Sequence, residues 1–308
     1  MSELIVSQLH PIFAAELIGA DLTTEPSAEL VSTVENAMAR YGILVVRDAE
    51  ITDAQQIRFS RAFGPLEIPS RPRGFAPDPN FKPRMARELF AAGNLDMAGN
   101  IRKRVSGEPN LAQGAERFHT DSSFHTMPTK WSALLGHETP PPSVGGDTLF
   151  ADARAAYDDL PQAVKDRIEN LIGLHDFWRG RQLAGFKGEI TPQMRESIPY
   201  GTIEHPLVRR MPYGRKTLFI GGHCYGVKGM SEEAGLALIE ELYAHATQEK
   251  YIYRHHWRRW DMTIWDNRCT MHAATPLLSD EYKRDMRRTT INEYGAETSA
   301  VEAMAAAA

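Results

Sequence analysis

The sequence predicts an α+β protein in which short strands form a sandwich or barrel and helices cover its outside. In the first 65 residues, an amphipathic helix, a buried strand and a second helix follow one another. From residue 119 onward, short β-prone runs alternate with helical stretches. Because no internal repeat or flexible linker divides the chain, we expect a single domain over residues 1–308.

The N-terminal elements carry clear start and stop signals. An apolar run at 43–46 follows Gly42, a typical helix stop, and is interpreted as a buried strand. Thr52 and Gln55 form a capping-box pattern that opens a second helix, which we expect to end at Gly64. The helix before Gly42 places five apolar residues on one face: Leu30, Val34, Ala37, Met38 and Tyr41.

Residues 66–118 differ from the rest of the chain. They are rich in proline and glycine, lack clear periodicity and hold nine basic residues against six acidic ones. A long stretch of this kind inside a compact domain is typical of a lid or binding segment, so we expect an active-site lid here. A basic lid suits an anionic substrate, and a solvated loop is the alternative interpretation.

The C-terminal part is predicted to contain two helices among short strands. One helix begins at Pro161 and extends to about Gly173, and the other begins at Ser231. Residues 295–308, which end in AMAAAA, are expected to be a frayed tail. The β-prone runs around the second helix are 216–220, 251–254 and 262–265.

Composition and charge exclude several classes of protein. A formal net charge of -5 argues against a nucleic-acid binder, because phosphate binding needs a basic surface. No apolar run approaches the roughly 18 residues that a membrane helix needs, and the N-terminus lacks a secretory-signal pattern. With only two cysteines, Cys224 and Cys269, we expect no disulfide framework and a cytoplasmic location.

Two histidines and an aspartate are the candidate metal ligands. In a strand, His119 and Asp121 would face the same side, with Thr120 facing away. His272 follows an apolar run and a polar turn, although a lone histidine there would usually be a core or surface residue. Together the three form the facial triad of non-haem iron oxygenases, which leaves coordination positions open. A closed structural zinc site would need four protein ligands, often cysteines.

A cationic segment follows His272 and is the candidate anion site. If it is extended, Arg284 and Arg288 share one face and could hold carboxylates in bidentate fashion. A solvated basic run is the alternative, and the position shortly after a candidate metal ligand favours anion binding. Thr148 follows a glycine-rich turn, and its hydroxyl could bind an anion oxygen.

These motifs resemble the TauD/TfdA family of iron(II)- and 2-oxoglutarate-dependent dioxygenases, most of all its aryloxyalkanoate branch. The resemblance covers most of the chain, in order and with sensible spacing. The segments that carry it are LHPIFAAELIGADL (9–22), ITDAQQIRFSRAFGPLE (51–67), HTDSSF (119–124), PPPSVGGDTLFADARAAYDDLP (140–161), WDNRCTMH (265–272) and RDMRRTT (284–290).

The resemblance implies a double-stranded β-helix, or jelly roll, flanked by helices, with iron(II), 2-oxoglutarate and dioxygen as the reacting partners. It implies three iron ligands: His119, Asp121 and His272. Thr148 and Arg284 are implied to hold the distal carboxylate of 2-oxoglutarate, and Arg288 to pair with the substrate anion and to share in co-substrate binding. One extra residue before the arginine pair leaves Lys283 and Arg287 open as alternatives.

The implied reaction is hydroxylation of a small anionic substrate, expected to be an aryloxyalkanoate, with ether cleavage and release of succinate and CO2. Phe177 and Trp178 are candidate substrate-contacting residues, although each could equally be core. A homo-oligomer is expected, because members of the family are often oligomeric. The alternatives are a taurine or other carboxylate dioxygenase, a zinc-dependent hydrolase with the same ligands, and a non-catalytic jelly-roll binding protein.

Overall fold

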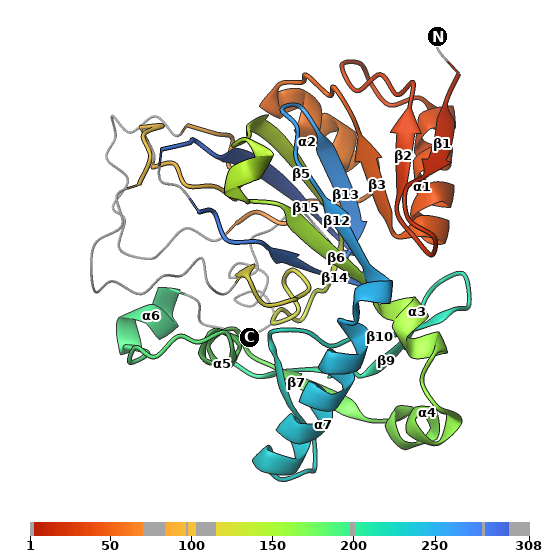
Figure 1. Cartoon of the computed structure of the whole chain (residues 1–308), viewed down its shortest axis with the longest axis vertical. Coiled ribbons are helices and arrows are strands. Elements are labelled where there is room, and N and C mark those ends of the chain that lie inside the picture. Colours follow the sequence, from red (N-terminus) through yellow and green to blue (C-terminus); the bar gives the residue numbers. More distant parts are fainter. Residues whose placement is uncertain are drawn as a thin grey trace.

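The computed structural model describes residues 3–69, 84–96, 98–102, 115–197, 201–278 and 281–295. A large sheet of order β1-β2-β3-β13-β5-β15-β4 runs through the upper half of the molecule (Figure 1). All its neighbouring strands are antiparallel except β2 and β3, which are parallel. Its strands are Ile5–Gln8 (β1), Ala15–Ile18 (β2), Ile43–Val46 (β3), Met262–Asp266 (β13), Thr129–Glu138 (β5), Asp285–Asn292 (β15) and Phe90–Ala91 (β4).

Three smaller antiparallel sheets complete the described β structure. One has the order β12-β6-β14, with strands Ile252–His255, Thr148–Asp152 and Thr270–Ala274. Another has the order β11-β7-β8, with strands Cys224–Val227, Ile172–His175 and Ile203–Pro206. The last pairs β10 (Lys216–Leu218) with β9 (Val208–Arg210).

The helices lie on the outside of these sheets (Figure 1). The α-helices are Ala28–Tyr41 (α1), Asp53–Arg61 (α2), Ala153–Asp158 (α3), Gln162–Ile168 (α4), Phe177–Leu183 (α5), Pro192–Ser197 (α6) and Glu232–Ala246 (α7). Two short 3₁₀ helices are Pro142–Val144 (η2) and Glu249–Tyr251 (η3). None of the helices in the described ranges has the length and apolar character needed to cross a lipid bilayer.

Local signals set the bounds of the first helices, and the predicted stop at Gly42 is confirmed. The Ser27 hydroxyl accepts a hydrogen bond from the Leu30 amide at 3.1 Å and caps α1. Gly42 ends α1 in the left-handed conformation, at a φ of 70°, which glycine adopts without steric cost. The capping box of Thr52 and Gln55 is present, but α2 ends at Arg61 rather than at Gly64. The backbone amides of Ala62 and Phe63 donate to the carbonyls of Phe59 and Ser60, three residues earlier, which tightens the final turn.

The predicted helix from Pro161 to Gly173 is too long. The α4 helix ends at Ile168, and the next strand begins at Ile172. This strand, β7, is hydrogen-bonded to both β8 and β11, so pairing across the chain replaces the helix that the local pattern favours. The helix predicted to begin at Ser231 is confirmed as α7, with Ser231 as its cap.

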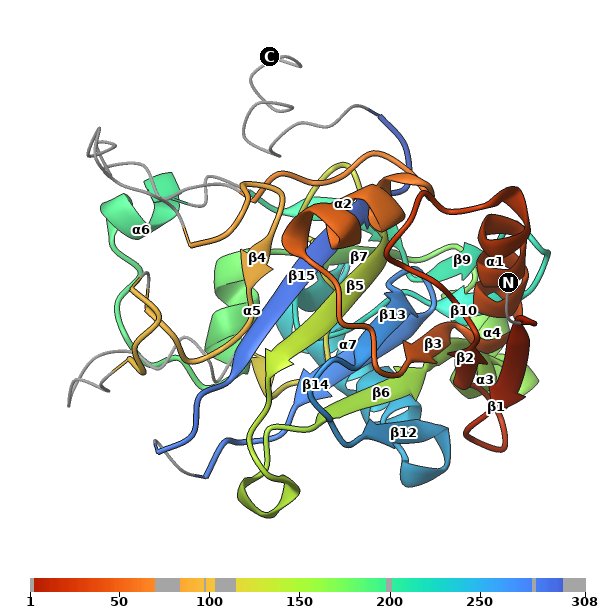
Figure 2. The same ribbon diagram turned by 90° about the horizontal axis from the view of Figure 1, so that it is seen from above.

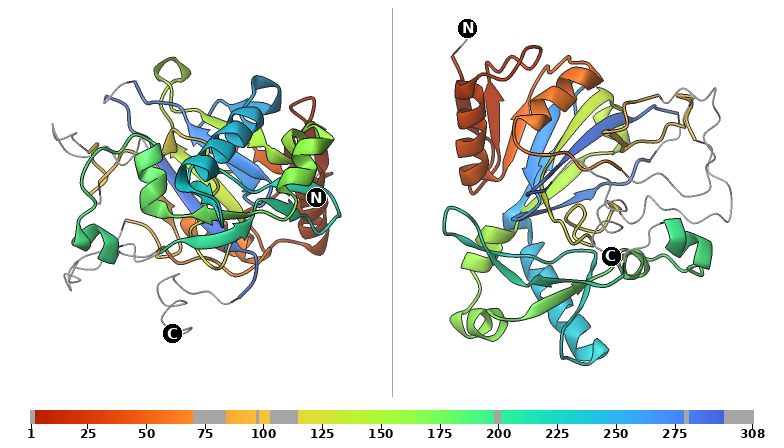
Figure 3. Two further views of the ribbon diagram at one scale, coloured as in Figure 1. Left: turned by 90° about the horizontal axis from the view of Figure 1, so that it is seen from below. Right: turned by 180° about the vertical axis from the view of Figure 1, so that it is seen from behind.

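The two faces of the large sheet have different partners. Trp131, Ala133 and Leu135 of β5 belong to a core cluster shared with α1 and α2, and Figure 2 shows α2 lying across β15 and β5. Leu134 has the opposite orientation and packs with Phe150 of β6 in a second cluster. Seen from below, α7 covers the strands on the other side of the molecule (Figure 3).

The β12-β6-β14 sheet packs against the large sheet, and helices lie outside both. This is the jelly-roll arrangement expected from the sequence. The expected lid is described only in part: within it, β4 pairs with β15. Residues 70–83, 97 and 103–114 of that segment, and 296–308 of the expected tail, lie outside the described residues.

Candidate metal centre

The three predicted ligands converge between the large sheet and β14. One suitable atom from each of His119, Asp121 and His272 lies within 4.8 Å of the others. The two histidines are joined by a pair of backbone hydrogen bonds of 2.9 and 2.8 Å, and their ring centroids are 4.2 Å apart. The predicted strand through 119–121 is wrong, because His119 makes a single bridge and Asp121 already lies in a turn. The turn, rather than strand alternation, directs the carboxylate to the histidines.

Each imidazole offers one nitrogen to the centre, and a hydrogen bond orients the ring of His119. His119 Nδ1 lies 2.9 Å from the Arg117 carbonyl oxygen, to which it donates, so Nε2 remains available to a metal. His272 Nε2 lies 3.8 Å from Asp121 Oδ1. The arrangement therefore offers two Nε2 atoms and one carboxylate oxygen to a shared ligand.

The charges at this centre suit a divalent cation. Burial, together with the neighbouring His119, lowers the pKa of His272 to about 3, and burial also lowers the pKa of His119. Burial alone would raise the pKa of Asp121, but Arg288 and the two histidines lower it below its ordinary value. Two neutral imidazoles beside an ionised carboxylate are the protonation states in which these groups bind a metal. The donor set therefore fits a metal ion.

Arg288 lies at the same carboxylate. Its Nη1 forms an ion pair with Asp121 Oδ1, and its guanidinium carbon lies 4.8 Å from the centroid of the Phe90 ring. Arg287 points to the other side of β15, where it pairs with Asp53 at 2.6 Å and with Asp285 at 2.9 Å. These contacts place Arg288 at the centre and Arg287 away from it.

Arg284 and the turn before Thr148 form a second polar position. The Arg284 guanidinium donates to the carbonyls of Ala92 at 2.5 Å and Gly146 at 3.4 Å, and burial lowers its pKa to about 10. The Thr148 hydroxyl accepts a hydrogen bond from Trp257 Nε1 at 3.0 Å, which leaves the hydroxyl proton available to an anion. Lys283 is exposed, so Arg284 is the better placed cation.

The two predicted aromatic residues differ in position. The Phe177 ring stacks on His223 with centroids 5.9 Å apart, and the His223 ring lies 5.8 Å from His119. Trp178 is only 4% exposed and meets Phe177 edge-on at 4.9 Å. Phe177 thus belongs to the side chains next to the centre, and Trp178 packs behind it.

Sequence reasoning missed three polar residues at this site. Ser132 and Asn267 form hydrogen bonds with Asp121, and the His223 ring lies edge-on to His119. Ser132 interrupts an otherwise apolar run, and Asn267 lies in the turn before His272, so both left a weak signal. Nothing in the sequence distinguishes His223 from the other histidines.

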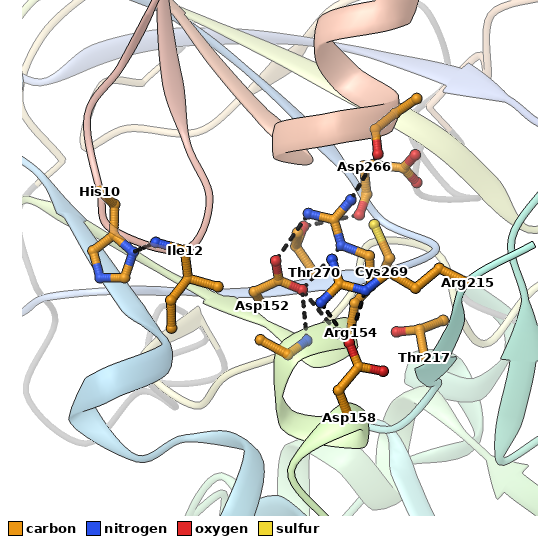
Figure 4. A network of polar contacts seen from close by, with 12 residues as sticks. His10, Ile12, Asp152, Arg154, Asp158, Arg215, Thr217, Asp266, Cys269 and Thr270 are labelled. Carbon is orange, nitrogen blue, oxygen red and sulfur yellow. Dashed lines mark hydrogen bonds and ion pairs between the residues drawn. The ribbon is translucent and has the colours of Figure 1, made fainter. Parts of the chain in front are cut away.

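A separate cluster of buried charge lies where β6 pairs with β14 (Figure 4). Asp152 and Arg154 form two parallel hydrogen bonds of 3.0 and 2.9 Å, and both side chains are 0% exposed. Thr270, two residues before His272, is the register partner of Asp152. This cluster lies at the end of the strand that carries His272, the second histidine of the candidate ligand set.

Comparison with known proteins gives consistent results. The family model "Taurine catabolism dioxygenase TauD, TfdA family" matches residues 6–290. An alpha-ketoglutarate-dependent 2,4-dichlorophenoxyacetate dioxygenase of Cupriavidus pinatubonensis is 34% identical over 93% of this chain and 96% of its own. An (S)-phenoxypropionate/alpha-ketoglutarate-dioxygenase of Sphingobium herbicidovorans is 31% identical over 88% of this chain and 89% of its own.

A solved structure agrees with these relatives. The crystal structure of AAD-2 in complex with Mn(II) and N-oxalylglycine has a TM-score of 0.81 and 31% identity, and it covers 96% of this chain and 100% of that one. The similarity extends across the described sheets rather than to one motif. From the match over residues 6–290 and these relatives, we conclude that the chain belongs to the TauD/TfdA dioxygenase family.

Proposed function

We propose that this 2-oxoglutarate-dependent dioxygenase uses iron(II) to hydroxylate an aryloxyalkanoate of the phenoxyacetate type. The observation that carries the proposal is the convergence of His119, Asp121 and His272, with Arg288 paired to the same carboxylate. Hydroxylation of the carbon next to the ether oxygen gives a hemiacetal, which breaks into a phenol and a carbonyl product. One oxygen atom of O2 enters the substrate and the other enters succinate, with release of CO2.

The metal ligands would be Nε2 of His119, Nε2 of His272 and one oxygen of Asp121. Three protein ligands leave one side of the metal open. When bound, iron(II) supplies the activation of dioxygen that the protein's own groups cannot provide. The protein's contribution is to hold the donors in fixed positions and to orient the two organic reactants.

Arg284 and Thr148 would bind the distal carboxylate of 2-oxoglutarate. A partly buried guanidinium whose described hydrogen bonds go to carbonyl oxygens gains a counter-charge from a carboxylate. The Thr148 hydroxyl, whose oxygen already accepts from Trp257, can donate its proton to the same group. The roles of Arg284 and Thr148 are therefore binding and orientation.

Arg288 would hold the substrate anion, so that the target C–H bond faces the metal. The Phe90 ring over its guanidinium and the Phe177 ring beside His223 offer apolar surface to an aryl group. Aryloxyalkanoates combine the carboxylate and the aromatic ring that these side chains match. The two curated relatives are named for substrates of this kind.

A taurine-type or other alkylsulfonate substrate is the alternative, because Arg288 could pair with a sulfonate as readily as with a carboxylate. The apolar rings of Phe90 and Phe177 favour the aryl substrate. A zinc-dependent hydrolase would have no use for the Arg284 and Thr148 position, which makes it the weaker candidate.

The deciding experiment measures succinate release with iron(II), 2-oxoglutarate and a panel of phenoxyacetates, phenoxypropionates, taurine and N-substituted amino acids. We expect the phenoxy acids to stimulate succinate release and to yield the corresponding phenol in equal amount. Stimulation by taurine alone would overturn the substrate assignment. The absence of succinate with every compound, or equal activity with Zn(II), would overturn the proposal that the protein is an iron(II)-dependent oxygenase.

We also propose that the protein is a cytoplasmic homo-oligomer. The two cysteines, Cys224 and Cys269, are buried free thiols, which suits a reducing compartment. Light scattering coupled to size-exclusion chromatography would test the oligomer, and a mass equal to one chain of 34.5 kDa would contradict it.

A further inference from the structure

We propose that Ser132 and Asn267 are positioning residues for Asp121, and that they set which carboxylate oxygen faces the metal. The inference deepens the proposed function, because it rests on Asp121 being a metal ligand. Neither residue touches the proposed substrate or co-substrate positions. Both act through the carboxylate and through the turn that carries it.

The three residues form a closed ring of hydrogen bonds. The Ser132 hydroxyl donates to Asp121 Oδ2 at 2.7 Å. Asn267 Nδ2 donates to Ser132 Oγ at 2.9 Å. The Asp121 amide donates to Asn267 Oδ1 at 3.0 Å. The ring therefore holds both the backbone and the side chain of Asp121.

The direction of each hydrogen bond is determined by the donors available. Asn267 Oδ1 receives two N–H groups, from the Asp121 amide and from Trp265 Nε1 at 3.0 Å, so this atom is the amide oxygen. Its other terminus is then the NH2 group, which donates to Ser132. Because Ser132 Oγ accepts there, its single proton is left to donate to Asp121 Oδ2.

This polarity separates the roles of the two carboxylate oxygens. Oδ2 is occupied by the Ser132 proton, whereas Oδ1 faces His272 Nε2 at 3.8 Å and Arg288. Rotation of the carboxylate would break the Ser132 hydrogen bond inside a region closed to water. The ring thereby favours one-oxygen coordination through Oδ1.

Ser132 lies in β5 of the large sheet and Asn267 directly follows β13, while Asp121 lies in a separate turn. Ser132 is 0% exposed and is the register partner of Trp265 on β13 and of Thr290 on β15. Asn267 is 1% exposed, and its backbone amide donates to the Lys130 carbonyl at 2.9 Å. The proposed ligand, which lies on a turn, is thus hydrogen-bonded to buried residues in and next to strands of the large sheet, the kind of support that precise metal sites need.

The test compares metal affinity in Ser132→Ala, Asn267→Ala and the double variant with that of a matched control, Ser60→Ala. Ser60 is also 0% exposed and shares one hydroxyl hydrogen bond of 2.7 Å with Thr289, on the α2 side of β15. Mn(II) dissociation constants are measured by calorimetric titration, and Co(II) visible spectra report ligand geometry. Thermal unfolding of each apoprotein confirms that it is folded.

We expect Ser132→Ala and Asn267→Ala each to weaken Mn(II) binding about 10- to 100-fold, the usual effect of removing a partner of a metal ligand. Each should also alter the Co(II) spectrum, whereas Ser60→Ala should change neither readout. Because both residues act on one carboxylate, the double variant should lose less than the product of the two single factors.

Mn(II) affinity within twofold of wild type in folded Ser132→Ala, with an unchanged Co(II) spectrum, would overturn the inference. Equal weakening in Ser60→Ala would also overturn it, because the effect would then reflect any buried serine. If the wild-type protein binds neither metal ion, the proposed function itself fails. That result is distinct from equal binding by wild type and variant.

Discussion

Two aspartate–arginine pairs in the interior differ in how fully their hydrogen-bonding capacity is used. Asp152 and Arg154 bind each other through two parallel hydrogen bonds. Arg154 also donates to the Ala39 carbonyl at 3.1 Å and to the Tyr213 hydroxyl at 3.0 Å. Both charged side chains are 0% exposed. This pair is saturated by the protein and has little left for a ligand.

The Asp121–Arg288 pair is unsaturated. A single guanidinium nitrogen contacts Asp121 Oδ1, and Arg288 Nε is buried without a hydrogen-bond partner among the described residues. The Arg288 side chain is 16% exposed and lies against the Phe90 ring. The same two residue types thus serve structure in one place and binding in the other, and the difference lies in their unused donors and acceptors.

The largest expected effect comes from removing a metal ligand. Asp121→Ala or His119→Ala should abolish succinate release, because two remaining ligands hold the metal weakly and leave its geometry undefined. The measurement is 2-oxoglutarate turnover in protein shown to be folded by circular dichroism. Full activity in either variant would remove the assignment of the metal centre.

Breaking the saturated Asp152–Arg154 pair should lower the free energy of unfolding. Arg154→Ala leaves Asp152 as an uncompensated buried charge, so we expect a loss of about 3–5 kcal/mol in the free energy of unfolding. Arg288→Ala should lose less, because Arg288 makes a single contact to Asp121 and the carboxylate keeps its hydrogen bond from Ser132. Urea unfolding of both variants measures the difference. Similar losses would show that the two pairs do not differ as their contacts indicate.

Breaking the unsaturated Asp121–Arg288 pair should weaken substrate binding. Arg288→Ala should raise the KM for a phenoxy acid about 10- to 100-fold, the factor expected for a charge-assisted hydrogen bond of roughly 1.5–3 kcal/mol. The KM for 2-oxoglutarate should change much less, since Arg284 holds that co-substrate in the proposed function. An isolated loss of 2-oxoglutarate affinity would reverse the roles of the two arginines.

The smallest effect concerns the cysteine beside the saturated pair. Burial raises the pKa of Cys269 and of Cys224 to about 12, and only the thiolate reacts with disulfide reagents. At pH 8 both thiols are therefore protonated as well as closed off from solvent. We expect no rapid thiol signal with an aromatic disulfide reagent until denaturant is added. Fast reaction of Cys269 in the native protein would show that the region around Arg154 opens.

Sequence reasoning succeeded where the information is local. Gly42 marks the end of α1, and the capping box of α2 involves residues three positions apart. Reasoning from local pattern alone was wrong for the residues after Ile168, where pairing of β7 with two other strands replaces a helical pattern. It also misplaced Asp121 in a strand, because the turn there depends on Asn267, 146 residues away.

By itself, the sequence determined the chemical types at the centre: His119, Asp121 and His272 as candidate ligands, followed in the chain by a cluster of arginines. Residue identity and spacing carry that information, because few reactions need this set. Only the tertiary structure decided which arginine reaches Asp121, since Arg287 and Arg288 are neighbours in sequence but lie on opposite faces of β15. It also decided that Ser132 contacts the Asp121 carboxylate and that Asn267 contacts Ser132, because hydrogen bonds between separate segments of the chain leave no local pattern.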